Sequence, residues 1–388
     1  MASLHVAVVG GGLVGITTAL ALGQQGYRVT LLDRQRPRVF TGALGLDIRN
    51  VALSPSSRSL LNEVGIWGGQ AAAPYHRMCI WEQWGNSQVE FDAADAGRTE
   101  LGWVVEMSAL VCAGWNKLDV TDGVDAVIDD ISRVTPTDDG VTVHLAEQAE
   151  QTFDFLVAAD GAQSVVRESL KLEVAQHPMD QVAIATVVQT ELPHQDTAWQ
   201  RFLEDGPLAF LPSPVANLCS VVWSQSASSA QRRMSLSDDD FCTEIGHSLE
   251  HRLGQVTAVD ARFSFPLIQQ RATDCAPHGR VLLVGDAMRV VHPLAGLGVN
   301  LGLEDVQAIL QVSAGPVDLS APGLWRRYAR QRQIRSEMMI RIMAMLHKVY
   351  TDPSPGMSLL RNVGVRSFNA LDGLKRQVMR EAMGLKRL

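Results

Sequence analysis

The first residues that could do chemistry are three glycines, Gly10, Gly12 and Gly15, spaced as GxGxxG near the start of the chain. The first glycine allows a tight turn, the second lets the backbone approach a pyrophosphate, and the third lets a helix pack closely on a strand. Asp33 follows 18 residues after Gly15. A carboxylate there can accept the ribose hydroxyls of an adenosine and would repel a 2′-phosphate. The pattern predicts an adenine dinucleotide site, and by itself does not separate FAD from NAD.

Two further stretches carry polar residues at predicted strand or helix ends. LVAADGAQSVVR places Asp160 and Gly161 after an apolar run, where the ligands of α/β sheets gather. DIRNVALSPSS places Arg49 on a loop just before a helix, and an arginine there can pair with a pyrophosphate.

A third stretch, VLLVGDAMRVVHPLAGLGVNLGLEDV, holds Asp286, His292, Pro293, Gly298 and Asn300. It offers a carboxylate for a sugar-like chain and a glycine-rich helix start for a negatively polarised heteroaromatic ring. A single phosphate would not need both features. This stretch therefore favours a flavin with its ribityl chain over NAD.

The elements that must position these residues can be predicted from the apolar pattern. A βαβ unit is expected from a strand His5–Val9, a helix Leu13–Gln25 and a strand Arg28–Asp33. Strands Phe153–Ala159 and Val281–Val284 should lead into the second and third polar stretches. Between Glu173 and Arg271 the pattern favours strands, with one helix near Phe241–Leu253. Long helices are expected over Leu324–Tyr350 and Gly373–Met383.

Taken together, the motifs resemble those of the class A flavoprotein monooxygenases, and most closely the ubiquinone-biosynthesis hydroxylases that act on polyprenyl-phenol or quinol rings. GPLAFLP from Gly206 and the closing KRQVMREAMGL also match that branch, so the resemblance spans nearly the whole chain. It implies an α/β fold: a Rossmann-like FAD-binding domain with an inserted, mainly β-sheet substrate domain and a C-terminal helical tail. The implied ranges are 1–75, 100–172 and 272–345 for FAD, 76–99 and 173–271 for substrate, and 346–388 for a basic helical segment.

The resemblance also implies the chemistry. NAD(P)H reduces FAD, O₂ forms a C4a-hydroperoxide on the reduced flavin, and one oxygen is transferred to an electron-rich ring. The glycines and Asp33 would bind the ADP half, and Arg49 would lie near the pyrophosphate. The other cofactor residues would be Asp160, Gly161, Asp286, Gly298 and Asn300. Pro293 would lie along the isoalloxazine, and His292 is a candidate for proton handling. No metal site is predicted.

Three positions depart from the family pattern. The usual Ala-His after Gly-Asp-Ala is Met288-Arg289, the usual Gln before Gly298 is Leu297, and the usual Glu-Asn in mid-chain is Glu106-Met107. The first two departures motivate an alternative of another class, a flavin-binding scaffold without turnover. A second alternative is a class A hydroxylase of a small soluble aromatic acid. It would need a cation in the substrate sheet, for which Arg201, Arg232 and Arg233 are available.

Charge and cysteine content limit the partners. Residues 321–388 hold 14 Lys and Arg against 4 Asp and Glu, whereas residues 1–320 hold 20 against 38. A basic tail on an acidic body suits an anionic membrane or a partner enzyme of a biosynthetic complex, and does not suit nucleic acid. Five cysteines without a CxxC pair fit a reducing cytoplasm. We therefore expect a cytoplasmic protein, peripheral to the inner face of the membrane if the tail binds lipid, with an aromatic or lipid-tailed substrate.

Overall fold

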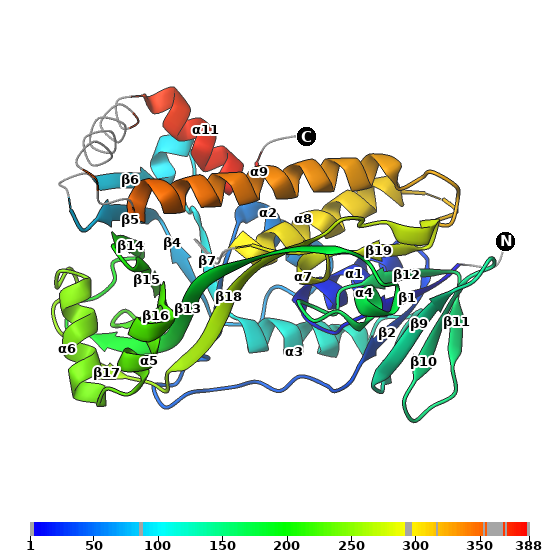
Figure 1. Cartoon of the computed structure of the whole chain (residues 1–388), viewed down its shortest axis with the longest axis horizontal. Helices are drawn as coiled ribbons and strands as arrows, with labels where there is room; N and C mark the ends of the chain where they lie inside the picture. Colours follow the sequence, from blue (N-terminus) through cyan, green and yellow to red (C-terminus); the bar gives the residue numbers. More distant parts are fainter. Residues whose placement is uncertain are drawn as a thin grey trace.

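The computed structural model describes residues 4–84, 88–291, 297–315, 317–351, 354, 368 and 371–385. A parallel sheet lies at one end of the elongated molecule and a larger, mainly antiparallel sheet at the other. The long strands β13 (Val174–Thr190) and β18 (Phe263–Ala272) run between the two ends (Figure 1).

The parallel sheet has the strand order β19-β12-β1-β2-β8. Its strands are β1 (His5–Val9), β2 (Arg28–Asp33), β8 (Val124–Ile128), β12 (Phe155–Ala158) and β19 (Val281–Leu283). These strands are nearly continuous apolar runs because helices cover the sheet. The helix α1 (Leu13–Gln24) packs against α3 (Met107–Leu118) and α8 (Leu297–Val312).

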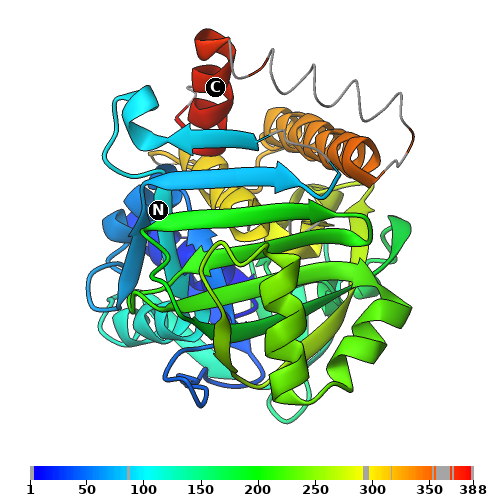
Figure 2. The same ribbon diagram turned by 90° about the vertical axis from the view of Figure 1, so that its left-hand side faces the viewer.

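The second sheet has the order β20-β18-β13-β16-β15-β14-β5-β6, with β17 paired to β13. Its other strands are β5 (Arg77–Glu82), β6 (Gln88–Asp92), β14 (Thr197–Leu203), β15 (Gly206–Pro212), β16 (Leu218–Ser226), β17 (Val256–Val259) and β20 (Arg289–Val290). The helices α5 (Ala227–Met234) and α6 (Asp238–Ser248) cover one face (Figure 2). Ile184, Phe210, Trp223 and Phe241 are buried in the core between that face and the helices.

Smaller elements complete the chain. One three-stranded sheet contains β3 (Asn50–Leu53), β4 (Ala72–Tyr75) and β7 (Gly102–Glu106), and another contains β9 (Ile131–Pro136), β10 (Val141–Leu145) and β11 (Gln151–Phe153). The short helices are α2 (Pro55–Glu63), η1 (Ala93–Ala96), α4 (Val165–Ser169), η2 (Pro277–Gly279) and α7 (Gly285–Met288).

Among the residues described after position 325, two helices lie along the upper edge in Figure 1: α9 (Arg326–Thr351) and α11 (Asp372–Ala382). Met379 and Met383 pack beside Ala93 and Leu101, which fixes α11 on the β6–η1 corner.

This architecture confirms the predicted fold class. The domain boundaries stay predictions. The helix α9 continues without a break across the predicted boundary between residues 345 and 346. In the range from Glu173 to Arg271 the strands appear as expected. The expected helix begins three residues earlier, at Asp238, and α5 was not foreseen. No helix among the described residues has both the length and the apolar character needed to span a bilayer.

Candidate functional site

The glycine turn between β1 and α1 is packed too closely for side chains at two of its three positions. A Cβ on Gly10 would lie 2.4 Å from the carbonyl oxygen of Ala159, and Gly10 has a φ of +103°. A Cβ on Gly15 would lie 1.8 Å from the carbonyl oxygen of Gly10. Gly12, by contrast, faces open space and begins α1 without a side-chain cap. The arrangement leaves the positive end of the helix open to an anion at Gly12.

Asp33 lies at the end of β2, next to this turn. Its carboxylate accepts the backbone N–H of Gly11 at 2.5 Å and that of Gln35 at 3.2 Å. The indole Nε1 of Trp115, on α3, donates to the carbonyl oxygen of Gly11 at 2.9 Å. Gly11 is therefore held from both sides. The sequence did not predict a role for Trp115 in this site, because nothing in the neighbouring residues distinguishes it from a tryptophan of the hydrophobic core.

Asp160 and Gly161 follow β12 at the neighbouring strand end. One carboxylate oxygen of Asp160 accepts the N–H of Val166 at 3.1 Å, and the other is buried with no partner among the described residues. Burial raises the pKa of Asp160. A buried oxygen without a donor is costly for the protein alone, and a ligand that donates a hydrogen bond would satisfy it.

Arg167, in the same motif, connects this strand end to the next one. Its buried guanidinium donates to the carbonyl oxygens of Ala162, at 2.6 Å, and Ala287, at 2.7 Å. Asp286, beside Ala287, stays accessible to solvent, yet the surrounding protein desolvates it enough to raise its pKa. Asp160 and Asp286 thus lie just after two adjacent strands, β12 and β19. Arg167 connects the segments that follow these strands.

Asn300 joins the third motif to the DIRNVALSPSS motif. Its side-chain oxygen accepts the N–H of Ser54 and the hydroxyl of Ser57, both at 2.8 Å, and its amide donates to the carbonyl of Ala52 at 2.7 Å. These bonds fix the start of α8, including Gly298, against the β3–α2 turn. The predicted catalytic residues His292 and Pro293 lie outside the described residues.

Arg49 is exposed at the end of the loop that precedes β3. The loop is anchored by Asp47, which is fully buried and accepts the N–H groups of Arg49, at 2.9 Å, and Ser108, at 3.1 Å. The N–H of Asp47 donates to Glu106, which keeps the usual glutamate of the family pattern and precedes the departure at Met107. The guanidinium of Arg49 thus extends from a fixed backbone.

Arg289, part of the departure at Met288-Arg289, lies in a buried ion cluster. Its guanidinium donates to Asp305 at 2.8 Å and to the carbonyl of Leu301 at 2.8 Å. Asp305 is fully buried and also accepts from Arg332 of α9, at 2.5 Å, and from the N–H of Gly285, at 2.9 Å. The departure therefore has a structural explanation, because Arg289 helps to fix the loop after β19. Sequence reasoning missed Asp305 and Arg332, which lie 16 and 43 residues further along the chain.

Comparison with known proteins agrees with this geometry. Residues 3–342 match the FAD binding domain family. The 3-demethoxyubiquinol 3-hydroxylase of Escherichia coli is 34% identical over 390 residues, which cover 98% of each chain. The structure of p-nitrophenol 4-monooxygenase PnpA from Pseudomonas putida covers 100% of this chain and 99% of its own, with a TM-score of 0.81 and 18% identity. Klebsiella pneumoniae HpxO, crystallised with FAD and uric acid, has a TM-score of 0.71 and 18% identity, covering 98% and 96%.

The family match covers most of the chain, and the E. coli relative covers nearly all of it. Both agree with the three strand-end motifs assembled above. The chain therefore belongs to the FAD binding domain family, within the ubiquinone-biosynthesis hydroxylases, and is an FAD-dependent oxidoreductase.

Proposed function

We propose that this chain hydroxylates the ring of a polyprenylated phenol or quinol, a ubiquinone precursor, with NAD(P)H as reductant and O₂ as oxidant. The names of its relatives support this substrate class. Such a tail needs a membrane or a partner enzyme to deliver it. We propose that the basic C-terminal part of the chain, residues 321–388, makes that contact.

The residues at the three strand ends fit FAD. The open helix end at Gly12 would take the pyrophosphate and Asp33 the ribose, while Arg49 would add a positive charge beside the phosphates. Asp160, with its buried oxygen, and Asp286 would accept or donate hydrogen bonds along the cofactor. FAD supplies the redox and oxygen chemistry when bound. The protein's part is to bind it, orient the ring and keep water from the site.

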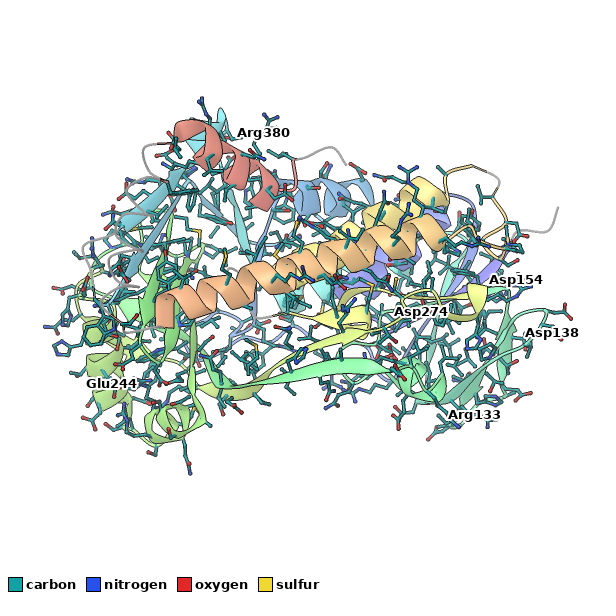
Figure 3. The ribbon with its side chains drawn as sticks, turned by 45° about the horizontal axis from the view of Figure 1, so that its top comes forward. Arg133, Asp138, Asp154, Glu244, Asp274 and Arg380 are labelled. Atoms are coloured by element: carbon teal, nitrogen blue, oxygen red, sulfur yellow. The ribbon has the colours of Figure 1, made fainter. Side chains whose placement is uncertain are left out.

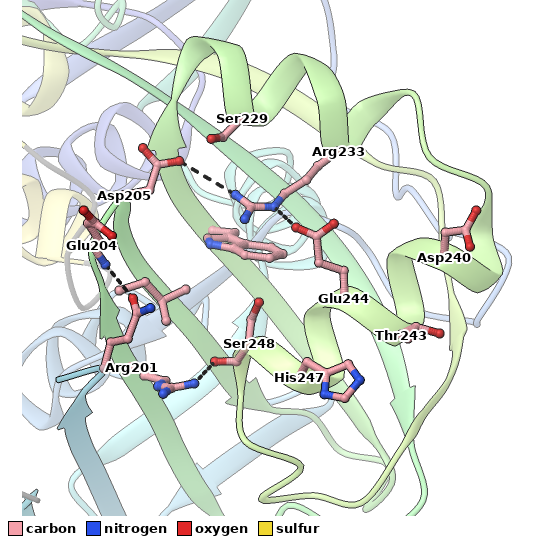
Figure 4. A pocket seen from close by; sticks show the side chains of 13 residues that line it. Arg201, Glu204, Asp205, Ser229, Arg233, Asp240, Thr243, Glu244, His247 and Ser248 are labelled. Atoms are coloured by element: carbon pink, nitrogen blue, oxygen red, sulfur yellow. Dashed lines mark hydrogen bonds and ion pairs between the residues drawn. The ribbon is translucent and has the colours of Figure 1, made fainter. Parts of the chain in front are cut away.

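The positions of three arginines are the observation that supports a substrate without a carboxylate. Arg201 donates to Ser248 and Glu250, while Arg232 and Arg233 pair with Glu244. All of these partners lie on or beside α6, on the helix-covered face of the large sheet. Figure 4 shows Arg201, Arg233 and Glu244 around a groove of about 860 Å³ on that face. None of the three arginines is therefore available on the opposite face, where an aromatic carboxylate would need a cation.

On the strands β15 and β16 the opposite face is formed by small and apolar side chains. Side chains alternate along a strand, and Val221 and Trp223 point into the core beneath α5 and α6. Leu218 and Leu211 instead pack beside residues of the FAD-binding part. Between them this face carries Ala209, Ser220, Val222 and Ser224. Such a wall suits an uncharged ring with an isoprenoid tail and does not favour a soluble aromatic acid.

The scaffold alternative loses its main support. It rested on the departures near the third motif, and Arg289 is explained by the ion cluster that stabilises the Gly285 loop. The presence of Arg289 therefore does not favour a protein without turnover.

Substrate choice tests the proposal. We expect the FAD-loaded protein to consume NAD(P)H and O₂ and to hydroxylate a phenol bearing one or two isoprene units, and not 4-hydroxybenzoate. Val222→Trp should lower kcat/KM by about tenfold or more, because the larger side chain would occupy the sheet face proposed to receive the substrate. Arg232→Ala, on the opposite face, should change it less than about twofold. Mass spectrometry of the product decides. Turnover of the acid alone would favour the soluble-substrate alternative, and bound FAD without turnover of either would favour the scaffold.

Asp33→Ala tests the adenosine site. The substitution removes the proposed ribose acceptor and also the acceptor of the Gly11 N–H. We expect the dissociation constant of FAD, measured by flavin fluorescence, to rise about tenfold or more. An unchanged constant would show that Asp33 has no part in cofactor binding.

A further inference from the structure

Helix α9 exposes an apolar stripe along its outer side. Ile334, Met338, Ile342 and Met345 follow one another at steps of four, four and three residues, which places them on one side of a helix. Their exposed fractions run from 37% to 62%. Met339 is buried on the inner side of the same helix. Four large exposed apolar side chains in one row are more than scattered surface residues, and they indicate a contact surface.

Arginines border this stripe. Arg327, Arg330 and Arg341 are exposed on the same side by helical spacing. From Arg326 to Thr351 the only carboxylate in the sequence is Glu337, which pairs with Arg271 at 3.3 Å and with Arg341 at 3.9 Å. The rest of the chain is strongly acidic, so an anionic surface would attract this side and repel the others.

We propose that the outer face of α9, formed by these four apolar residues and three arginines, docks on an anionic phospholipid bilayer. The helix has 26 residues and is therefore about 39 Å long. In Figures 1 and 3 no other described element lies over its outer side. An apolar stripe flanked by cations is the pattern of a helix that lies in the membrane interface.

The inner side of α9 connects this face to the flavin site. Met339 packs with Phe202 of β14, Leu301 of α8 and Val291 of the loop after β19. Arg332 binds Asp305, which in turn holds Gly285. Only the thickness of one helix, about 10 Å, thus separates the proposed membrane face from elements of the site. This inference rests on the proposed function, since a polyprenyl tail that stays in the bilayer requires the site to lie near the membrane.

Vesicle binding by the FAD-loaded full chain tests the proposal without turnover. We expect the protein to sediment with vesicles of phosphatidylcholine and phosphatidylglycerol at low salt, and much less with phosphatidylcholine alone or at high salt. Ile334→Ser/Met338→Ser/Met345→Ser should reduce binding roughly tenfold or more, as should Arg327→Gln/Arg330→Gln/Arg341→Gln. The matched control is Val120→Ser/Leu192→Ser/Val215→Ser, which removes exposed apolar side chains from other elements and should bind as the wild type does.

Three results would overturn the proposal: no binding of the wild type to anionic vesicles, unchanged binding of both α9 variants, or a wild-type oligomer that the serine variant dissociates in light scattering. The last would make the face a protein interface. Turnover of a short-tailed, water-soluble phenol without vesicles is measured on the same proteins. If the wild type did not turn over this phenol, the proposed function would be contradicted. If the wild type turned over the phenol but did not bind vesicles, only the membrane face would be contradicted.

Discussion

Replacing Gly12 with alanine should leave the protein folded but largely without FAD, whereas the same replacement at Gly15 should disrupt the fold. The two glycines are three residues apart in one turn, yet their surroundings differ. A Cβ on Gly12 meets nothing within 4 Å, so the free protein tolerates it. That open space is where the backbone would approach the pyrophosphate, and a methyl group there would hold the phosphates away. We expect FAD affinity to fall by about a hundredfold, or roughly 2.7 kcal/mol.

Gly15→Ala has a different physical effect. Its Cβ would lie 1.8 Å from the carbonyl oxygen of Gly10, so α1 would have to move away from β1. Displacing packed backbone costs about 3 kcal/mol or more. Thermal unfolding of the apoproteins and flavin fluorescence titration separate the two effects. Apo Gly12→Ala should melt within about 1 °C of the wild type, and Gly15→Ala well below it. Equal melting temperatures, or normal FAD binding by Gly12→Ala, would contradict the assignment of this turn.

The sequence predicted those parts of the site whose geometry is local. GxGxxG predicted the turn because the closest contact that requires Gly15, with the carbonyl oxygen of Gly10, lies within one βαβ unit. The contact of Gly10 with Ala159 comes instead from the end of a distant strand. Asp33 was predicted because a strand end fixes where its side chain points. For Gly15 and Asp33 the residues that impose the geometry lie close together in the chain.

Parts that depend on distant segments could not be predicted. The three bonds of Asn300 connect it to residues about 245 positions away, and no spacing rule relates them. The face on which Arg201 lies depends on the register of β14 against β5 and on where α6 packs. Arg289 looked like an unexplained departure because its acceptor Asp305, and Arg332, which binds the same carboxylate, lie on two other helices. Pairing across the fold, rather than local pattern, sets these positions.

Asp305→Asn should produce the largest loss of stability among the isosteric substitutions considered for this chain. Asp305 is fully buried between the guanidinium groups of Arg289 and Arg332. An amide of the same shape leaves two buried positive charges facing each other with one carboxylate fewer, and breaking a buried ion pair costs about 3–5 kcal/mol. With an unfolding entropy of about 2.1 cal/mol/K per residue, that corresponds to a drop in Tm of roughly 4–6 °C for a chain of this length.

Glu304→Gln is the matched control, because it changes the neighbouring carboxylate in the same way. Glu304 is partly exposed and pairs with Arg332 and Arg335 at 3.2–3.5 Å. Solvent screens such a pair, so the cost should stay below about 1 kcal/mol, or roughly 1 °C in Tm. Asp305→Asn should also weaken FAD binding, since Gly285 loses its charged acceptor beside Asp286, whereas Glu304→Gln should not. If calorimetry gave both variants the same Tm, the buried cluster would contribute no more than a surface pair. The fixing of the β19 loop would then have to come from Arg167 instead.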